Sequence, residues 1–333
     1  MIRYEKARWG LSPAYSKGGL PFYCWKRQVP SLDHEILDCV VYLYPSIEDA
    51  EQGVDAGGTG FLISIYPEAE KLEEWEHLYA VSNAHVVGNG PEQARSPVVR
   101  LTSLSGEPDF LDLGFEHWLP QSTGADLAIY YFGLVKSDIF RFRSINSEMM
   151  LTKQKLRSLN VGPGDDVFMV GRFFLQEGTQ RNTPSVRFGN ISMMPWEPVQ
   201  HPSGIDQESF LVEMRTISGY SGSPVFLHYP YMPSPPKIVD RSGLAVRLST
   251  KPGKTQLSNA YLLGVDWGHM QFKEAVFLKI EKGDDVEYDP TQFVADSHSG
   301  QSGVVPAWVL HEFLYSEGLE EMRKEAEQNK SSV

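Results

Sequence analysis

The sequence predicts an all-β fold made of two small antiparallel β-barrels, followed by a C-terminal α-helix. Most of the chain consists of short runs rich in β-branched and aromatic residues, separated by Gly, Pro, Asn and Asp. This pattern is typical of antiparallel barrels and sandwiches and not of parallel βαβ folds. About eleven such runs are present, which fits two small barrels better than one. The only strong helical spacing of apolar residues begins at Pro306, a residue type suited to the first turn of a helix.

The first barrel is expected within residues 36–140, after an N-terminal extension of residues 1–35. Its expected strands are CVVYLYP, GTGFLISIY, HLYAVSN, PVVRLTS and DLAIYYFG. Residues 141–160 lose the strand pattern and turn polar and basic. We interpret them as the connection between the barrels, because a Gly-Pro-Gly turn follows directly.

The second barrel is expected within residues 161–303, and the helix within residues 304–333. The expected strands are DDVFMVGRFF, PSVRFGNISMM, SFLVEMR, SPVFLHY, AYLLGVDWG and AVFLKIE. Gly318 is expected to split the helix into two pieces, and the charged end of the helix is expected to fray.

Three segments are interpreted as loop insertions. Loops of this length are usually functional or disordered. They are the acidic YPEAEKLEEWEHLY, the Pro-rich stretch after SPVF, and the acidic EKGDDVEYDPTQFVADSHSGQSG before the helix.

Composition excludes several classes of function. A net charge of −13 over 333 residues argues against binding to a phosphate backbone. No stretch approaches the ~20 apolar residues that cross a bilayer, and the N-terminus lacks the apolar region of a secretory signal. Cys24 and Cys39 are the only cysteines and are interpreted as packed thiols. We therefore expect a cytoplasmic protein with no nucleic-acid or membrane partner. Motifs for metal ions and phosphate cofactors are missing, so neither a metal nor a cofactor is expected.

The most specific motif is RTISGYSGSPVF, residues 215–226. It matches the pattern Gly-x-Ser-Gly-Ser/Gly-Pro, which should arise by chance on the order of once per thousand chains of this length. The motif predicts a loop that presents Ser221 as a nucleophile, with the backbone amides of Gly219 and Ser221 beside it as an oxyanion hole.

Two upstream segments supply the partners that such a serine needs. YAVSNAHVV contains His85 and GADLAIYYF contains Asp126, each in an apolar, strand-like run. A serine hydroxyl requires a base, and the base requires a group that orients it. His85 is expected to take the proton of Ser221, and Asp126 to hold the imidazole. Each residue alone has an ordinary structural interpretation, but the order His, Asp, Ser is that of a Ser-His-Asp hydrolase on a β-barrel scaffold.

These segments resemble the trypsin-like (chymotrypsin-fold) serine peptidases, and in particular the bacterial branch of HtrA-like proteases and glutamyl endopeptidases. GTGFLIS, VGPGDDVFMVGRF, LLGVDWG and SGVVPAWVLHEF extend the resemblance, which covers about residues 36–315. It implies two six-stranded barrels with the site in the cleft between them and a C-terminal helix. It also implies hydrolysis of peptide bonds in protein substrates through an acyl-enzyme.

By the same resemblance, the substrate pocket includes Arg215, Thr216, Asp266, Trp267 and Gly268. Glutamyl endopeptidases have a histidine at the position of Asp266. An anion there would repel an acidic P1 side chain or neutralise Arg215. We therefore expect a basic or polar P1 residue.

Tyr220 is a departure from the family pattern. In relatives that are activated by cleavage, this position is an aspartate that pairs with the new N-terminus. Tyrosine cannot make that ion pair. We expect regulation by other means, such as a protein partner that orders the long loops.

The sequence has two alternative interpretations. An α/β-hydrolase esterase requires Gly-x-Ser-x-Gly and the order Ser, acid, His, but Ser223 stands where the second glycine is required. The other alternative is a catalytically silent peptidase fold that binds or scaffolds a partner. All catalytic positions are filled, but a collapsed oxyanion loop would still leave the protein silent.

Overall fold

The structure of the chain is a computed structural model. It describes residues 32, 34–88, 95–102, 107–136, 143–173, 178, 182–214, 219–228, 238–239, 245–246, 260–282 and 285–331. Most of the expected N-terminal extension, including Cys24, lies outside these residues. The contacts group residues 33–333 into one unit.

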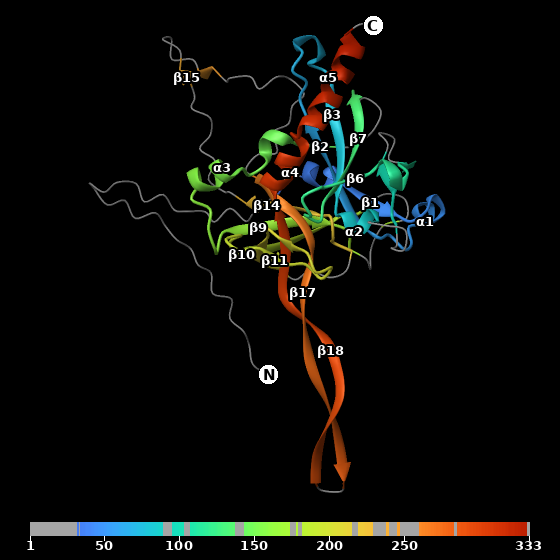
Figure 1. Ribbon diagram of the computed structural model, residues 1–333, viewed down its shortest axis with the longest axis vertical. Coiled ribbons are helices and arrows are strands. Elements are labelled where there is room, and N and C mark those ends of the chain that lie inside the picture. Colours follow the sequence, from blue (N-terminus) through green and yellow to red (C-terminus); the bar gives the residue numbers. More distant parts are fainter. Residues whose placement is uncertain are drawn as a thin grey trace, which may run out of the picture. The chain divides into compact units, whose positions relative to one another are not determined.

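The first half of the unit is a curled, mainly antiparallel sheet (Figure 1). Its strands run in the order β5-β4-β1-β2-β3-β7-β6, and β8 pairs in parallel with β2. The strands are β1 (Val40–Tyr44), β2 (Gly58–Ile65), β3 (Glu76–Ser82), β4 (Val98–Thr102), β5 (Pro108–Asp112), β6 (Leu119–Pro120), β7 (Ala128–Val135) and β8 (Ile145–Asn146). All eight residues of β2 are buried. The middle of the sheet is therefore covered on both of its faces, whereas β5, β6 and most of β7 are only partly buried or exposed.

Short helices connect these strands and lead into the second half. They are the 3₁₀-helices η1 (His34–Cys39), η2 (Glu70–Leu72), η3 (Phe115–His117) and η4 (Ser147–Met149), and the α-helices α1 (Ile47–Gln52), α2 (Ala84–Val87) and α3 (Lys153–Ser158). The connection expected at residues 141–160 thus carries β8, η4 and α3. The Cys39 thiol is buried and forms no disulfide within the described part of the chain, in agreement with its interpretation as a packed thiol.

The second half is a closed six-stranded barrel with the order β10-β13-β18-β17-β14-β9. Its strands are β9 (Asp166–Gly171), β10 (Ser185–Met193), β13 (Phe210–Glu213), β14 (Pro224–His228), β17 (Ala260–Lys282) and β18 (Asp285–Pro306). Two small hairpins complete the described strands: β11 (Val199–Gln200) with β12 (Asp206–Gln207), and β15 (Ile238–Val239) with β16 (Ala245–Val246). The predicted double-barrel fold is confirmed; the first sheet has eight strands and curls without a closing pair among the described residues.

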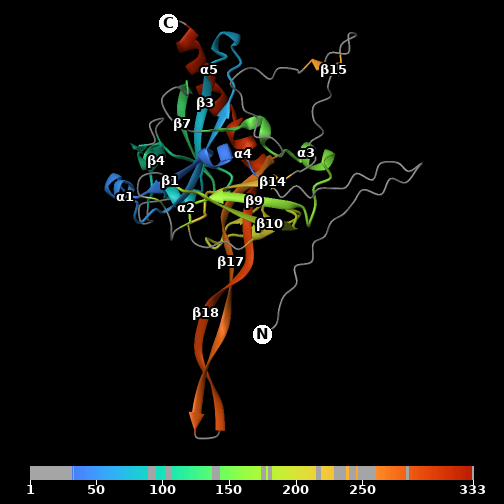
Figure 2. The same cartoon turned by 180° about the vertical axis from the view of Figure 1, so that it is seen from behind.

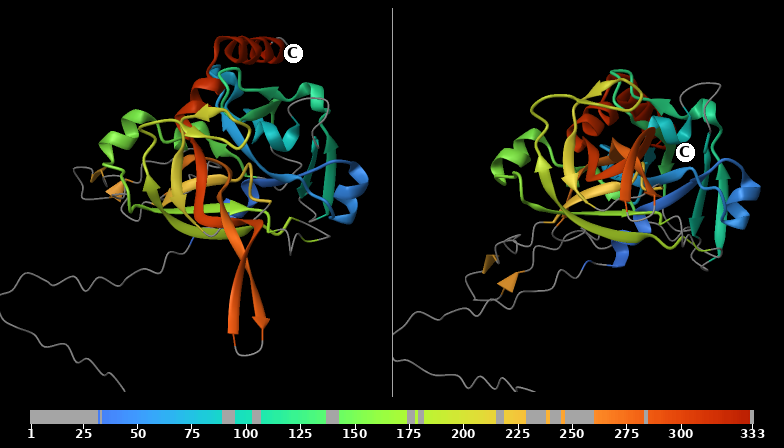
Figure 3. Two further views of the ribbon diagram at one scale, coloured as in Figure 1. Left: turned by 60° about the horizontal axis from the view of Figure 1, so that its bottom comes forward. Right: turned by 90° about the horizontal axis from the view of Figure 1, so that it is seen from below.

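One expected loop is a strand. The acidic segment before the helix was predicted to be an insertion, but β17 and β18 pair along it down to Lys282↔Asp285. The outer halves of these strands project from the barrel as a twisted two-stranded arm (Figures 1 and 2). The left view of Figure 3 shows the same arm.

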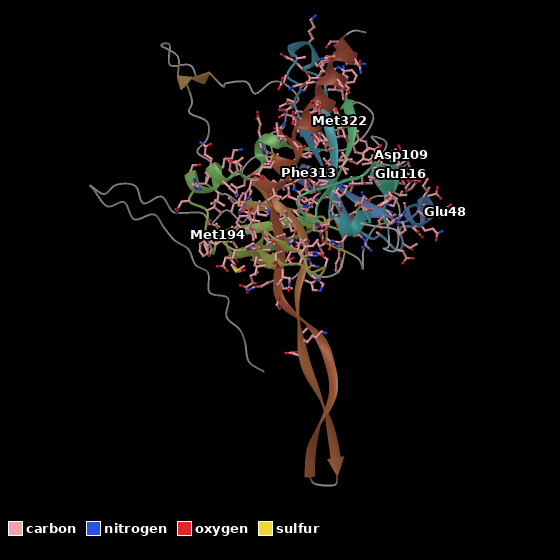
Figure 4. The ribbon with its side chains drawn as sticks, in the orientation of Figure 1. Glu48, Asp109, Glu116, Met194, Phe313 and Met322 are labelled. Atoms are coloured by element: carbon pink, nitrogen blue, oxygen red, sulfur yellow. The ribbon has the colours of Figure 1, made fainter. Side chains whose placement is uncertain are left out.

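The C-terminal helix is split in two, as predicted. The break lies at Tyr315–Ser316, between α4 (Ala307–Leu314) and α5 (Glu317–Ser331), so Gly318 falls in the first turn of α5. Figure 4 marks the two helices by Phe313 and Met322. The expectation that the charged end frays is wrong, because α5 is described as helix to Ser331.

Two charged side chains hold α5 against the first sheet. The buried Arg323 donates to the Tyr79 hydroxyl at 3.0 Å and to the Leu314 carbonyl at 2.7 Å. Glu327 Oε1 lies 2.9 Å from His77 Nε2, and its carboxylate also accepts from the backbone of residues 68 and 69. None of the described helices has the length and apolar content that crossing a bilayer needs.

Candidate functional site

His85 is placed by the end of β3. This strand ends at Ser82, Asn83 follows as the N-cap, and α2 then carries His85 in its first turn. The Asn83 side chain donates to the Asp126 carbonyl at 2.8 Å. The residues before His85 therefore hold the backbone of the loop that carries Asp126.

The Asp126 carboxylate contacts His85 twice. Oδ2 lies 2.6 Å from His85 Nδ1, and Oδ1 accepts the His85 backbone N–H at 3.0 Å. Because an ionised carboxylate only accepts, Nδ1 of His85 carries the proton of this bond. In the neutral ring, Nε2 then keeps a lone pair. This is the tautomer that a general base needs.

Burial of Asp126 alone would raise its pKa. The contacts with His201 and His85 outweigh burial, so the pKa of Asp126 lies well below its ordinary value. The carboxyl, only 7% exposed, is therefore an anion at neutral pH.

The loop of the β11–β12 hairpin also reaches Asp126, a contact that the sequence did not predict. His201 Nε2 lies 3.4 Å from Asp126 Oδ2, and the Gln207 side chain accepts the Asp126 backbone N–H at 2.9 Å. The His201 ring packs edge-on against Trp267, with 4.9 Å between centroids. The only local signal is a histidine in a His-Pro-Ser-Gly turn. No motif connects that turn with Asp126.

His85, Asp126 and His201 also form a group that could hold a metal ion among the described residues, with ligand atoms within 4.8 Å of one another. The Ser203 backbone N–H, however, donates to His201 Nδ1 at 3.1 Å. The proton of a neutral His201 ring is therefore on Nε2, and a protonated nitrogen cannot ligate a metal. The group fits a hydrogen-bonded arrangement better than a metal centre.

The turn that carries Ser221 docks on the start of β2. The Ser221 carbonyl accepts the Thr59 N–H at 2.9 Å, and the Thr59 hydroxyl donates to the Gly219 carbonyl at 2.8 Å. Gly222 has a φ of +86°, and a Cβ there would lie 1.9 Å from the Thr59 carbonyl oxygen. Only glycine fits this position, because the backbone is left-handed and the approach is close.

The same contacts bring the serine turn next to α2. A Cβ on Gly58 would lie 2.7 Å from a methyl of Val86 and 3.1 Å from the Ser221 carbonyl oxygen. Gly58 thus separates the residue after His85 from the backbone of Ser221. The described hydrogen bonds include the one between His85 and Asp126 but none between His85 and Ser221.

Part of the expected substrate pocket lies beside the serine. A Cβ on Gly268 would lie 3.8 Å from Ser221 Oγ. Trp267 is buried and donates to the Ser209 hydroxyl at 3.1 Å. Arg215 and Thr216 lie outside the described residues.

Asp266 lies in the interior and not on the exposed wall of the pocket. Its side chain is 1% exposed, and burial raises its pKa to about 7. The Ser302 hydroxyl lies within hydrogen-bond distance of both Asp266 Oδ1 and the Gly268 carbonyl. One hydroxyl has one proton, so Ser302 can donate fully to only one of these two acceptors, and the buried Asp266 Oδ2 has no hydrogen-bond partner among the described residues.

Tyr220 is buried in the second barrel. Its hydroxyl accepts from Arg187 Nε at 2.9 Å and contacts the Ser185 hydroxyl. The residue before Ser221 is therefore anchored to β10 by neutral and charge-assisted hydrogen bonds.

Neither the protein-family models nor the curated proteins contain a match to this chain. Solved structures do. The chain is similar to the apo protease domain of MamO from Magnetospirillum magneticum, with 17% identity and a TM-score of 0.42 over 85% of this chain and 99% of that chain. It is also similar to the inactive form of the Rv3671c protease, with 14% identity and a TM-score of 0.39 over 86% of this chain and 96% of that chain. The HtrA-type protease AlgW with a decapeptide has 13% identity and a TM-score of 0.40 over 81% of this chain and 53% of that chain. At these scores the likeness is partial, and the description of the fold rests on the strand pairing of this chain.

Proposed function

We propose that the chain is a serine endopeptidase that hydrolyses peptide bonds in protein substrates. In this proposal Ser221 is the nucleophile, His85 the general base and acid, and Asp126 the group that orients His85. The observation that carries the proposal is the 2.6 Å contact between His85 Nδ1 and Asp126 Oδ2, with the serine turn docked beside α2.

The proposed reaction follows from the tautomer of His85. Nε2 takes the proton of Ser221 as Oγ attacks the substrate carbonyl, and the ionised Asp126 stabilises the resulting imidazolium. Nε2 then returns the proton to the leaving amine, and an acyl-enzyme remains on Ser221. Water, deprotonated by the same nitrogen, releases the acid product.

The backbone amides of Gly219 and Ser221 are the proposed oxyanion hole. Within the described residues neither amide has a hydrogen-bond acceptor, so both are available to a developing oxyanion. Gly219 has a φ of +99°, a conformation that glycine adopts without strain. Losing one donor of this kind costs about 10²–10³ in rate.

Labelling with a fluorophosphonate probe tests the nucleophile. The wild-type protein should be labelled, and Ser221→Ala and His85→Ala should not. Ser223→Ala is the matched control, because Ser223 is a fully buried serine two residues further on and its loss should leave labelling intact. Labelling that persists in Ser221→Ala would refute the assignment.

The proposal extends to the substrate and to regulation. Because the Asp266 side chain is buried and burial raises its pKa to about 7, it gives no support for a basic P1 residue. Cleavage of a peptide library will define P1. The anchored Tyr220 supports the proposal that N-terminal cleavage does not activate the protein. That a protein partner or narrow specificity restrains it instead is part of the proposal. The proposed location is the cytoplasm.

A second candidate is a silent binding module with this fold. The observation in its favour is that no hydrogen bond joins His85 to Ser221 among the described residues. Such bonds are often long in free enzymes and tighten only with substrate, so we place this candidate second. Capture of a partner by a protein that no fluorophosphonate labels would favour it.

A further inference from the structure

We propose that His201 is a positioning residue for Asp126: its Nε2–H, supplied from the second barrel, holds the carboxylate in the orientation that His85 needs. This inference rests on the proposed peptidase function. It adds a residue to the site that no motif in the sequence indicates.

The tautomer of His201 is fixed by its own turn. Nδ1 accepts the Ser203 backbone N–H at 3.1 Å and lies 2.7 Å from the Ser203 hydroxyl. A backbone N–H can only donate, so Nδ1 bears the lone pair and Nε2 bears the proton. Nε2 lies 3.4 Å from Asp126 Oδ2, which is longer than the 2.7–3.2 Å of an ordinary N–H···O hydrogen bond, so the proposed contact is a weak electrostatic one.

The ring has little freedom to move away. Its backbone N–H donates to the Ile205 carbonyl at 2.7 Å, and the Gly204 N–H donates to the His201 carbonyl at 2.8 Å. The Trp267 ring packs against one side of the imidazole. The His201 side chain is 9% exposed. The turn thus presents Nε2 to Asp126 with its orientation already set.

With this contact, donors from both halves of the molecule surround Asp126. Oδ1 accepts from the His85 backbone, whereas Oδ2 faces both the His85 and the His201 rings. If the carboxylate rotated about its Cβ–Cγ bond, Oδ2 would leave both rings. His201 therefore makes rotation costly, and it does so as a neutral donor that adds no charge to compete with the imidazolium of His85.

Two substitutions separate this role from a role in loop structure. In His201→Gln, the side-chain amide can place an N–H near the position of Nε2. In His201→Asn, the side-chain oxygen can take the place of Nδ1 and accept from Ser203, but no donor reaches Asp126. A positioning role predicts that the Gln variant behaves like wild type and that the Asn variant is impaired. A structural role of the turn predicts the reverse.

Two readouts are measured on the full chain. With an internally quenched peptide that the wild type cleaves, His201→Asn should lower kcat about three- to tenfold with KM unchanged, as expected for loss of one weak donor to an ion. In the Ser221→Ala background, proton NMR should show the low-field resonance of the proton between His85 and Asp126. This resonance should weaken or vanish with His201→Asn and persist with His201→Gln.

Equal kcat values and equal resonances in wild type and His201→Asn would overturn the inference. So would a Gln variant that loses as much as the Asn variant. The NMR readout needs no activity: if the wild type neither cleaves peptides nor reacts with a fluorophosphonate, the proposed function fails, and the resonance still decides the role of His201.

Discussion

Replacing Asp266 by asparagine should stabilise the protein above pH 7 and have little effect near pH 4. Burial raises the pKa of Asp266 to about 7, whereas an aspartate in the unfolded chain titrates near 3.9. A carboxyl group whose pKa is raised in the folded state does not reduce the free energy of unfolding at a pH below its unfolded pKa. It reduces that free energy fully at a pH above its folded pKa. The wild type should therefore lose stability between pH 4 and pH 7 through this residue, because the unfolded chain ionises and the folded chain does not.

The size of the effect follows from the shift. A difference of roughly 3 pKa units at 1.36 kcal/mol per unit gives about 4 kcal/mol as an upper value. Asparagine has nearly the shape of the protonated acid, and its side-chain oxygen can still accept from the Ser302 hydroxyl. The variant should escape most of the pH-dependent cost.

Urea unfolding of wild type and Asp266→Asn, both in the Ser221→Ala background, gives the free energies at pH 4, 6, 7 and 8.5. The difference between variant and parent should grow by several kcal/mol over this range. Asp206→Asn is the control, because Asp206 is exposed on β12 and its replacement should give a flat difference. A flat difference for Asp266→Asn as well would refute the inference that this carboxyl is held neutral.

Two further predictions concern the serine turn and α5. In urea unfolding, Gly222→Ala should lower the free energy of unfolding by more than Gly204→Ala does. Both glycines have φ near +85°. The new Cβ at position 222 would lie 1.9 Å from a backbone carbonyl oxygen, whereas a Cβ at position 204 meets open space. The left-handed backbone alone costs about 1–2 kcal/mol, so equal losses at the two positions would contradict the close approach. For Glu327, burial would raise the pKa of the carboxyl, but the hydrogen bond with His77 and two backbone amides outweigh burial and lower it. A lowered pKa gives stability that is present above the unfolded pKa and lost as the pH falls, so melting temperatures from pH 6 to pH 3 should fall more steeply for wild type than for Glu327→Gln; Glu325→Gln, on the exposed side of the same helix, should follow the wild type.

The sequence could predict those parts of the fold that depend on local patterns. Short β-branched runs separated by turn residues indicate antiparallel strands because alternate residues of a strand face one core. The break in the C-terminal helix was also predictable, although it lies at Tyr315–Ser316 and not at Gly318. The position differs because Tyr315 leaves the helical conformation and stacks on His311 at 4.4 Å.

Features that depend on contacts between distant segments could not be predicted. The end of α5 looks polar enough to fray, but Arg323 and Glu327 bind Tyr79 and His77 of β3, more than 200 positions away. The outer part of β18 looks like a loop because its sequence is acidic, and only its pairing with the distant residues of β17 makes it a strand. His201 reaches Asp126 across the two halves of the molecule, and no spacing in the sequence reports that approach.

Thr59 joins the two halves at the turn that carries Ser221. This buried residue of the first sheet donates its N–H to Ser221 and its hydroxyl to Gly219, and its hydroxyl also accepts the N–H of Arg172 from the second barrel. Three hydrogen bonds would stretch together if one half slid against the other. Heat or denaturant should therefore unfold both halves in a single cooperative transition. No intermediate should be populated in which one half has unfolded and the serine turn keeps its native conformation.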